Sequence, residues 1–339
     1  MSGNCCSKNN SCLDSSKNIP VVSTSISFKD ILGAWKARWG IRRMNYTVNP
    51  GLYAVGRPDS DSIVLVSANY KLTFDILRKN LSGLNCWLLI LDTKGVNVWC
   101  AAGKGTFGTY ELVNRIEDVR LAEIVTHRKL ILPQLGAPGV NSHDVKRYTG
   151  FSVTYGPVRA NDIKEFISSG YKATKEMRRV KFTFRDRLVL TPMELVGSAK
   201  ITLPVFGVLF IFNLFANHQF GISDVVAYLG AKLTGAFITP VLLPFIPGKA
   251  FSFKGWLLGL GWAAFILWMF GWFAADSLFL SIGYMLLLPA VSAYLALNFT
   301  GCSTYTSQSG VFKEMKIALP LIIGSAIIGA VLTIAGKLI

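Results

Sequence analysis

The sequence predicts an α/β domain with a largely parallel sheet, followed by an all-α transmembrane domain of about five helices. Short apolar runs alternate with amphipathic stretches between residues 60 and 195, and longer apolar runs of about 20 residues recur from residue 196 onward. Charge divides the chain at the same place, because residues 1–195 hold 28 of the 35 Lys and Arg and 16 of the 19 Asp and Glu. We therefore expect a disordered, cysteine-containing tail at 1–38, a soluble domain at 39–192 and a helical membrane domain at 193–339.

Short apolar runs predict the strands of the soluble domain. These runs are 63–66, 86–91, 130–132, 151–155 and 182–190. Amphipathic stretches between them predict helices at 73–81, 109–119 and 161–169. The alternation indicates a Rossmann-like domain, in which ligands bind beyond the carboxyl ends of the strands.

The ends of the predicted strands carry small, polar or Gly- and Pro-rich strings. Such strings let a wide, flat ligand approach the backbone closely. The candidates in them are Ser67, Asn69, Gly136, Tyr155 and Gly156. Ordinary turns give similar strings in any α/β fold, so the pattern indicates a binding edge without identifying the ligand.

One cysteine, Cys100, lies in a segment that follows the strand 86–91 and opens a helix: residues 97–105 read Asn-Val-Trp-Cys-Ala-Ala-Gly-Lys-Gly. The positive end of a helix dipole stabilises a thiolate, and a thiolate ligates soft metals. The alternative is a small buried cysteine at a strand end. The segment matches neither a Walker A loop nor a phosphatase-type cysteine loop, and the chain has no Cys-His-Asn or Ser-His-Asp set.

This segment resembles the mercury-methylating corrinoid proteins of anaerobic microbes, as do residues 49–56 (Asn-Pro-Gly-Leu-Tyr-Ala-Val-Gly) and 68–75 (Ala-Asn-Tyr-Lys-Leu-Thr-Phe-Asp). The resemblance covers most of the chain and is most specific at 92–109. It implies a bound cobalamin-type corrinoid, with Cys100 as the lower axial ligand of cobalt and the catalytic residue. The Asp-x-His-x-x-Gly motif of other corrinoid proteins is absent, which leaves Cys100 as the available donor. The implied corrinoid contacts are Ser67, Asn69, Asn97, Val98, Trp99, Cys100, Ala101, Ala102, Gly103, Lys104, Gly105, Gly136, Tyr155 and Gly156. The alternative to a corrinoid contact for Lys104 is a solvent-exposed lysine at the start of the helix.

The resemblance implies a corrinoid-dependent methyltransferase of one-carbon metabolism that transfers a methyl group from cobalt to Hg(II), forming methylmercury. A thiolate opposite the methyl group should help the methyl leave with its electrons toward such an electrophile. The implied partners are a methyl donor of the methyl-tetrahydrofolate type and a small ferredoxin with two 4Fe–4S clusters; no nucleic acid is expected. The basic segment 172–187 could face that ferredoxin, although an anionic membrane surface is the preferred explanation.

Two other functions stay open. The corrinoid iron–sulfur methyl carrier of acetyl-CoA synthesis is similar around Asn69-Tyr70-Lys71 and Gly103-Lys104, but that protein is soluble and has an N-terminal four-cysteine cluster, which this chain lacks. A membrane permease with a cytoplasmic regulatory domain would bind no corrinoid and would not depend on Cys100. Nothing in the sequence identifies the native methyl acceptor.

Five apolar runs predict membrane spans. They are 199–216, 225–246, 256–275, 278–298 and 317–336. Seven Lys and Arg between residues 172 and 187 precede the first span, whereas the connection 217–224 has none, so we expect the soluble domain on the cytoplasmic side of the inner membrane. The first 25 residues lack the apolar core of a signal peptide. Lys232, within the second span, is a functional candidate or an interfacial lysine that snorkels, and Pro240 and Pro244 predict a kink there.

The other cysteines suggest no disulfide framework in a cytoplasmic domain. Cys5, Cys6 and Cys12 lie in the polar tail, where they could capture Hg(II) or form an incidental reduced tail. Cys86 lies in a predicted strand and is expected in the core. Cys302 precedes the last span, and the sequence identifies no partner for it.

Overall fold

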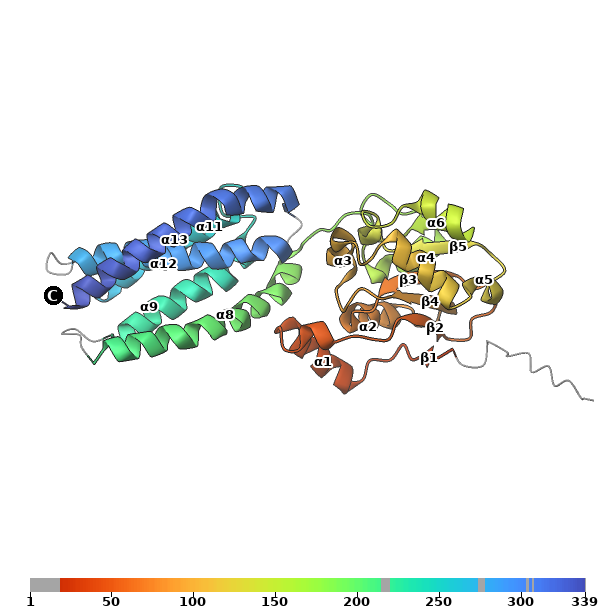
Figure 1. Cartoon of the computed structure of the whole chain (residues 1–339), viewed down its shortest axis with the longest axis horizontal. Helices are drawn as coiled ribbons and strands as arrows, with labels where there is room; N and C mark the ends of the chain where they lie inside the picture. Colours follow the sequence, from red (N-terminus) through yellow and green to blue (C-terminus); the bar gives the residue numbers. More distant parts are fainter. Residues whose placement is uncertain (1–18, 215–219, 274–277, 303–304, 307, 339) are drawn as a thin grey trace, which may run out of the picture. The chain divides into compact units, whose positions relative to one another are not determined.

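The chain forms two compact units (Figure 1). The computed structural model describes residues 19–214, 220–273, 278–302, 305–306 and 308–338. The α/β unit comprises Met1–Ala37 and Arg42–Arg179, and the helical unit comprises Arg38–Ile41 and Val180–Ile339. The boundary after Arg179 comes earlier than the predicted boundary at residue 192.

The α/β unit has a mixed six-stranded sheet in the order β1-β2-β4-β3-β5-β6. Strands β4, β3, β5 and β6 are parallel, whereas β2 pairs with β4 in antiparallel register. The strands are β1 Val21–Val22, β2 Gly51–Val55, β3 Val64–Ala68, β4 Cys86–Leu91, β5 Lys129–Leu132 and β6 Ser152–Tyr155. The predicted strands at 63–66, 86–91, 130–132 and 151–155 are therefore confirmed.

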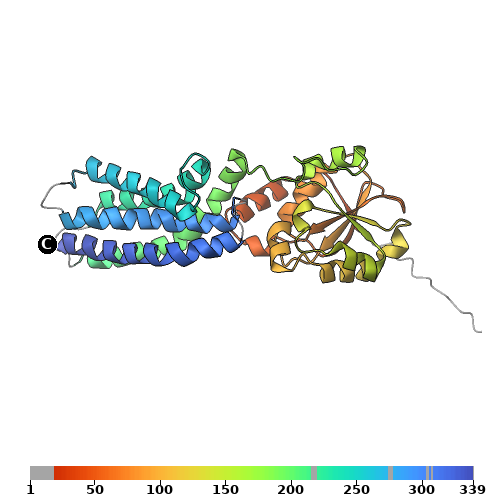
Figure 2. The same ribbon diagram turned by 90° about the horizontal axis from the view of Figure 1, so that it is seen from above.

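Helices cover both faces of this sheet (Figure 2). They are α2 Lys71–Asn80, α3 Val98–Lys104, α4 Thr109–Asp118, α5 Leu121–Ile124, α6 Ser142–Thr149 and α7 Ile163–Ser168, while α1 Phe28–Arg38 contacts α2 through ion pairs. On one face Leu89 of β4 packs in a cluster with Leu112 of α4, and on the other face Leu88 packs in a cluster with Phe74 of α2. Because β4 is buried on both faces, all six of its side chains are apolar, as is typical of a central parallel strand.

Two predictions near the ends of this region are wrong. Residues 28–38 belong to helix α1 and not to a disordered tail; Ser27 and Asp30 exchange hydrogen bonds at its first turn. The segment 182–190 is not a strand but contains the start of α8 Phe184–Phe212. Thr183 and Asp186 form the same pair of reciprocal hydrogen bonds there, and this N-terminal cap favours a helix over a strand.

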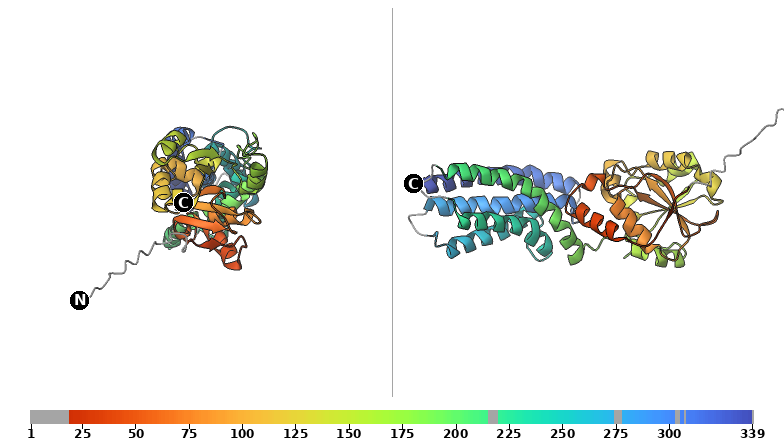
Figure 3. Two further views of the ribbon diagram at one scale, coloured as in Figure 1. Left: turned by 90° about the vertical axis from the view of Figure 1, so that its right-hand side faces the viewer. Right: turned by 90° about the horizontal axis from the view of Figure 1, so that it is seen from below.

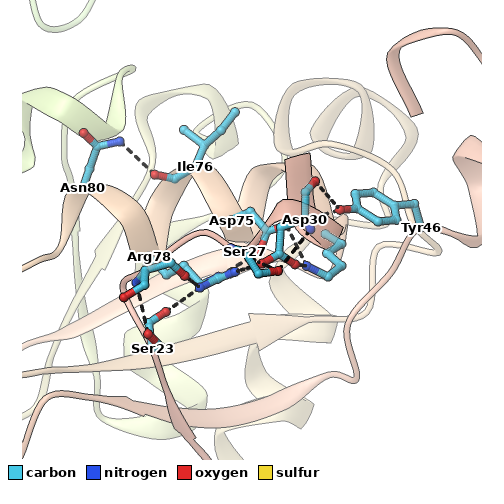
Figure 4. A network of polar contacts seen from close by, with 10 residues as sticks. Ser23, Ser27, Asp30, Tyr46, Asp75, Ile76, Arg78 and Asn80 are labelled. Carbon is cyan, nitrogen blue, oxygen red and sulfur yellow. Dashed lines mark hydrogen bonds and ion pairs between the residues drawn. The ribbon is translucent and has the colours of Figure 1, made fainter. Parts of the chain in front are cut away.

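An ion network fixes α1 against α2 (Figure 4). The Arg78 guanidinium donates to Asp30 and to Asp75 at 2.8 Å each, and to the carbonyl of Ser23 at 2.5 Å. Lys71 Nζ lies 2.6 Å from both carboxylates. Burial alone would raise the pKa of Asp30, but hydrogen bonds, that from Lys71 foremost, outweigh it and lower the pKa. This stabilisation is therefore present above a pH of about 4 and is lost as the pH falls below that value.

Arg78→Met should release α1 from α2, because it leaves buried acceptors without their donor; we expect a cost of about 3 kcal/mol. Hydrogen exchange of the full-length protein in detergent would show it as about 100-fold faster exchange in residues 28–38. Arg147→Met is the matched control, since the Arg147 side chain is 65% exposed and its contacts with Asp144 and the Tyr148 hydroxyl lie at the surface. Equal exchange in both variants would contradict the assigned role of Arg78.

The helical unit is a bundle of long helices that run side by side (Figure 3). Among the described residues, five helical segments are long and apolar enough to cross a membrane, judged by length and composition alone. They are Phe184–Phe212, Ile222–Leu242, Phe251–Met269, Leu278–Gly301 and Ser309–Leu338. Each overlaps one of the five predicted runs. Their elements are α8 Phe184–Phe212, α9 Ile222–Leu233, α10 Thr239–Leu242, α11 Phe251–Met269, α12 Leu278–Asn298 and α13 Gln308–Leu338, with the π-helical turn η5 Thr234–Ile238 between α9 and α10 and the turn η7 Phe299–Cys302 after α12.

The segment Ile222–Leu242 changes from α-helical to π-helical geometry just before Pro240, near the kink that the prolines predict. Helix α9 passes into η5, and Pro240 follows at the start of α10. A proline lacks the backbone N–H that a regular helix needs, and a π-helical turn accommodates the altered hydrogen bonding. A Cβ at Gly235 would lie 2.5 Å from the carbonyl oxygen of Ser292, so a glycine is needed for α12 to pack this closely.

Candidate functional site

A pocket of about 270 Å³ lies at the carboxyl ends of β3, β5 and β6. The connections leaving β3 and β5 diverge there, since the one from β3 leads to β4 on one side and the one from β5 leads to β6 on the other. Sheets of this type bind ligands at such a switch point. Five of the residues expected to contact the ligand line the pocket: Ser67, Asn97, Val98, Trp99 and Gly156.

The start of α3 places Cys100 beside this pocket but not in its lining. The side chain of Asn97 caps the helix by accepting a hydrogen bond from the Cys100 N–H at 2.9 Å. Ala101 and Ala102 are buried in the core beneath the helix, whereas Cys100 is half-buried and its thiol is free. Cys100 therefore lies on the side of α3 that faces away from the core, which we call its outer side.

The surface next to Cys100 is open. A Cβ at Gly103 or Gly105 would meet no described atom within 4 Å. Gly103 follows Cys100 by one turn on the same side of α3, and Gly105 ends the helix with φ of +79°. Lys104 is exposed. A helix side without side chains beside a cysteine fits a wide planar group, such as a corrinoid, whose metal would take the sulfur as a ligand.

Asn69 holds the turn that leads into α3. Its Oδ1 accepts hydrogen bonds from the backbone N–H of Thr93 and of Gly95 at 3.1 Å each, and the Thr93 hydroxyl lies 2.9 Å away. Its Nδ2 donates to Asp92 Oδ1 at 3.1 Å. Asn69 is 5% exposed and does not line the pocket. The structure thus places this predicted ligand contact as a positioning residue for the turn before Cys100.

Two further predicted contacts also stabilise loops. The Tyr155 hydroxyl donates to the carbonyl of Val140 at 2.7 Å, and burial raises the pKa of this phenol. A Cβ at Gly136 would lie 2.5 Å from the Phe107 ring, so a glycine lets the loop after β5 pack over that ring. Neither residue lines the pocket.

Helix α2 contributes pocket residues that the sequence pattern does not predict as ligand contacts. Thr73 brings a hydroxyl to the wall, and Ile76 and Leu77 bring apolar surface. Pro157 and Val158 follow Gly156 in the same wall. Pro157 and Val158 continue the Gly- and Pro-containing string that follows β6, whereas nothing in the sequence of the α2 residues separates them from an ordinary helix face.

Of the other cysteines, Cys86 lies outside the site. Cys86 is buried in the core, as predicted, and burial raises the pKa of its thiol to about 12. Cys5, Cys6 and Cys12 lie outside the described residues, and their proposed capture of Hg(II) stays a prediction. Cys302 ends the turn η7. Within the described part of the chain, no group of three or more His, Cys, Asp or Glu is arranged to hold a metal ion.

Comparison with known proteins finds relatives of the α/β unit. Residues 38–167 match the CdhD family, described as the CO dehydrogenase/acetyl-CoA synthase delta subunit. The gamma subunit of the acetyl-CoA decarbonylase/synthase complex from Methanopyrus kandleri is 34% identical over 122 residues, which cover 35% of this chain and 26% of the relative. The gamma subunit from Methanocaldococcus jannaschii is 31% identical over 139 residues, with coverage of 40% and 28%. That from Archaeoglobus fulgidus is 31% identical over 126 residues, with coverage of 37% and 26%.

These matches concern part of the chain and part of each relative. The chain spans about a quarter of the length of the curated relatives. The family match ends at residue 167, before the long segment of the helical unit begins at Val180. The predicted relation of the α/β unit to proteins of acetyl-CoA synthesis is confirmed, whereas the relation to mercury methylation stays a prediction.

Asn69→Ala should loosen the turn before α3, because two buried N–H groups lose their acceptor; we expect a cost of about 3 kcal/mol. The readout is hydrogen exchange of residues 93–104 in the full-length protein. Asn80→Ala is the control, since the Asn80 amide bonds only a carbonyl of its own helix and should change stability by less than about 0.5 kcal/mol. Unchanged protection of 93–104 in Asn69→Ala would refute the positioning role.

Proposed function

We propose that the α/β unit binds a corrinoid against the outer side of α3, with Cys100 as the lower ligand of cobalt, and transfers its methyl group to Hg(II) to form methylmercury. The observation that carries this proposal is the capped, half-buried Cys100 beside the open surface of Gly103 and Gly105 at the binding edge of the sheet. The relatives from acetyl-CoA synthesis support the broader proposal of corrinoid methyl transfer in one-carbon metabolism. The resemblance of residues 92–109 to mercury-methylating proteins supports the choice of acceptor.

In this proposal, different residues around α3 and the pocket have different roles. The corrinoid supplies the cobalt-held methyl group. Asn97 fixes the first turn of α3, which carries Cys100. As a ligand of the cobalt, the Cys100 sulfur would be an electron-rich donor, and such a donor would favour transfer of the methyl group to an electrophile. The pocket of about 270 Å³ is too small for a whole macrocycle, and we assign it to a peripheral group, with the hydroxyls of Ser67 and Thr73 at its wall.

The comparisons favour a second candidate, a corrinoid methyl carrier that hands the methyl group to an enzyme of acetyl-CoA synthesis. This candidate uses the same site and the same cofactor. It differs in the acceptor, which would be another protein's metal centre or a nucleophile and not Hg(II). The helical unit, for which the family match gives no counterpart, is the feature of this chain that the carrier does not explain.

We further propose that the five apolar helical segments cross the inner membrane and that the α/β unit lies in the cytoplasm. The basic segment 172–187 next to the first apolar helix supports this orientation, since cytoplasmic flanks are enriched in Lys and Arg. A methyl donor of the methyl-tetrahydrofolate type and a small ferredoxin with two 4Fe–4S clusters are the partners that the resemblance implies. If the purified protein held no corrinoid, that result would favour a permease with a regulatory domain.

Cys100→Ala should abolish methylmercury formation while the protein remains folded, because alanine offers no ligand for cobalt. The assay combines anaerobic membranes, the ferredoxin, a methyl donor, a low-potential reductant and Hg(II). Cys86→Ala is the matched control: its buried thiol lies in the core, so this variant should retain activity. Bound corrinoid is measured in parallel by its visible absorption.

The outcomes separate the candidates. Methylmercury from the wild type and from Cys86→Ala but not from Cys100→Ala supports the proposal. A wild type that holds corrinoid and passes its methyl group to acetyl-CoA synthase, but forms no methylmercury, supports the carrier. A wild type that binds no corrinoid overturns both and leaves the permease.

Gly103→Leu should separate folding from cofactor binding. Leucine replaces a glycine within a helix, where the open space accepts its side chain, so stability should rise by roughly 0.5–1 kcal/mol. The same side chain occupies the surface beside Cys100, and we expect corrinoid retention to fall at least about tenfold, which corresponds to 1.4 kcal/mol. Gly197→Leu in α8, also in open space, is the control. Full corrinoid retention by Gly103→Leu would show that the cofactor does not lie against this side of α3.

A further inference from the structure

The helical unit contains a cavity of about 640 Å³ between helices α8 and α9 on one side and α12 and α13 on the other. Its volume lies in the range of small-molecule sites, which is about 300–1,000 Å³. The wall is almost entirely apolar, with side chains such as Leu288 of α12 and Ala326 of α13. The polar residues Asp224, Tyr228 and Lys232 enter it from α9 at intervals of four residues, and therefore from one side of that helix.

Lys232 is a buried cation for which the described residues supply one hydroxyl and no carboxylate. Its side chain lines the cavity and the residue is 8% exposed. Its Nζ donates to Thr202 Oγ1 at 3.0 Å, and the Thr202 hydroxyl in turn donates to the Ser198 carbonyl. An ammonium has three N–H donors, so the described contact leaves capacity for an anionic acceptor. A lysine in such surroundings is costly, and that cost favours a bound counter-charge.

Asp224 does not provide this counter-charge. Lys337 Nζ lies 3.1 Å from its carboxylate, and the Gly221 N–H and the Tyr284 hydroxyl also donate to it. Asp224 precedes Lys232 by eight residues, which is about 12 Å along a helix. Lys232 and Lys337 are thus buried to a similar degree, but of these two only Lys337 has a carboxylate beside it among the described residues.

The cavity opens between α8 and α13. Three apolar residues of its lining are themselves exposed: Ile201 is 56% exposed, Val208 64% and Ile323 50%. With these helices in a bilayer, such a rim would face the acyl chains of lipids. A ligand dissolved in the membrane could then enter sideways, without crossing the polar ends of the bundle.

We propose that this cavity binds a single-chain lipid anion, with its apolar chain along the wall and its carboxylate or phosphate head at Lys232. The apolar lining selects the chain, and the uncompensated ammonium selects the negative head. The Tyr228 hydroxyl, 3.4 Å from the hydroxyl of Thr202, offers a second polar contact near that head. This site is separate from Cys100 and does not depend on the function proposed for the α/β unit.

The test uses the full-length protein in nanodiscs and a palmitate analogue that carries a photoreactive diazirine in its chain. We expect labelled peptides from α8, α9, α12 and α13, and competition by unlabelled palmitate. Lys232→Met should raise the concentration for half-maximal labelling about tenfold, because a charge-assisted hydrogen bond is lost. Lys200→Met is the matched control, since Lys200 is exposed on α8 and does not line the cavity. A lysophosphatidate analogue with the same diazirine tells a phosphate head from a carboxylate head.

The alcohol analogue of the same chain tests the head group in the wild type, so the result does not depend on the stability of a variant. It should label weakly and equally in the wild type and in Lys232→Met. Labelling by the alcohol as strong as by the acid would overturn the proposal. So would labelling of the acid that is unchanged in Lys232→Met, or labelling spread without preference over all the apolar helices, which would indicate surrounding lipid only.

Discussion

The candidate site depends on one buried side-chain amide, that of Asn69. It links the ends of β3 and β4, because its carbonyl oxygen accepts the N–H groups of Thr93 and Gly95 while its NH₂ group donates to Asp92. Gly95 has φ of +72°, and a Cβ there would lie 2.6 Å from the Met44 carbonyl oxygen, so the turn tolerates little change. The position of α3 follows from this turn, and with it the position of Cys100.

The sequence predicts the central strands and not the N-terminal helix, for a physical reason. A strand buried on both faces requires a continuous apolar run, and 86–91 has one. Helix α1 instead depends on ion pairs from Asp30 to Lys71 and Arg78, which are 41 and 48 residues away along the chain. Local patterns do not contain such pairs. The segment 182–190 shows the converse error: its apolar run predicts a strand, but the cap formed by Thr183 and Asp186 begins helix α8 there.

The candidate site is predictable in its location but not in the role of each residue. Small and polar residues at strand ends serve ligands and turns alike. The hydroxyl of Tyr155 is used by the Val140 carbonyl, and Gly136 accommodates Phe107, whereas Asn97 both caps α3 and lines the pocket. Only the folded structure separates these cases, because the partners of each side chain come from other parts of the chain.

The two buried lysines of the helical unit show why burial alone does not identify a site. Lys232 and Lys337 are 8% and 6% exposed, and each is expensive to bury in an apolar bundle. Lys337 is explained by the Asp224 carboxylate, which makes that pair a structural element. For Lys232 the described residues provide a hydroxyl, and its surroundings provide a cavity. A buried ammonium whose described partner is a hydroxyl, next to space for a ligand, supports the proposed anion site in the helical unit.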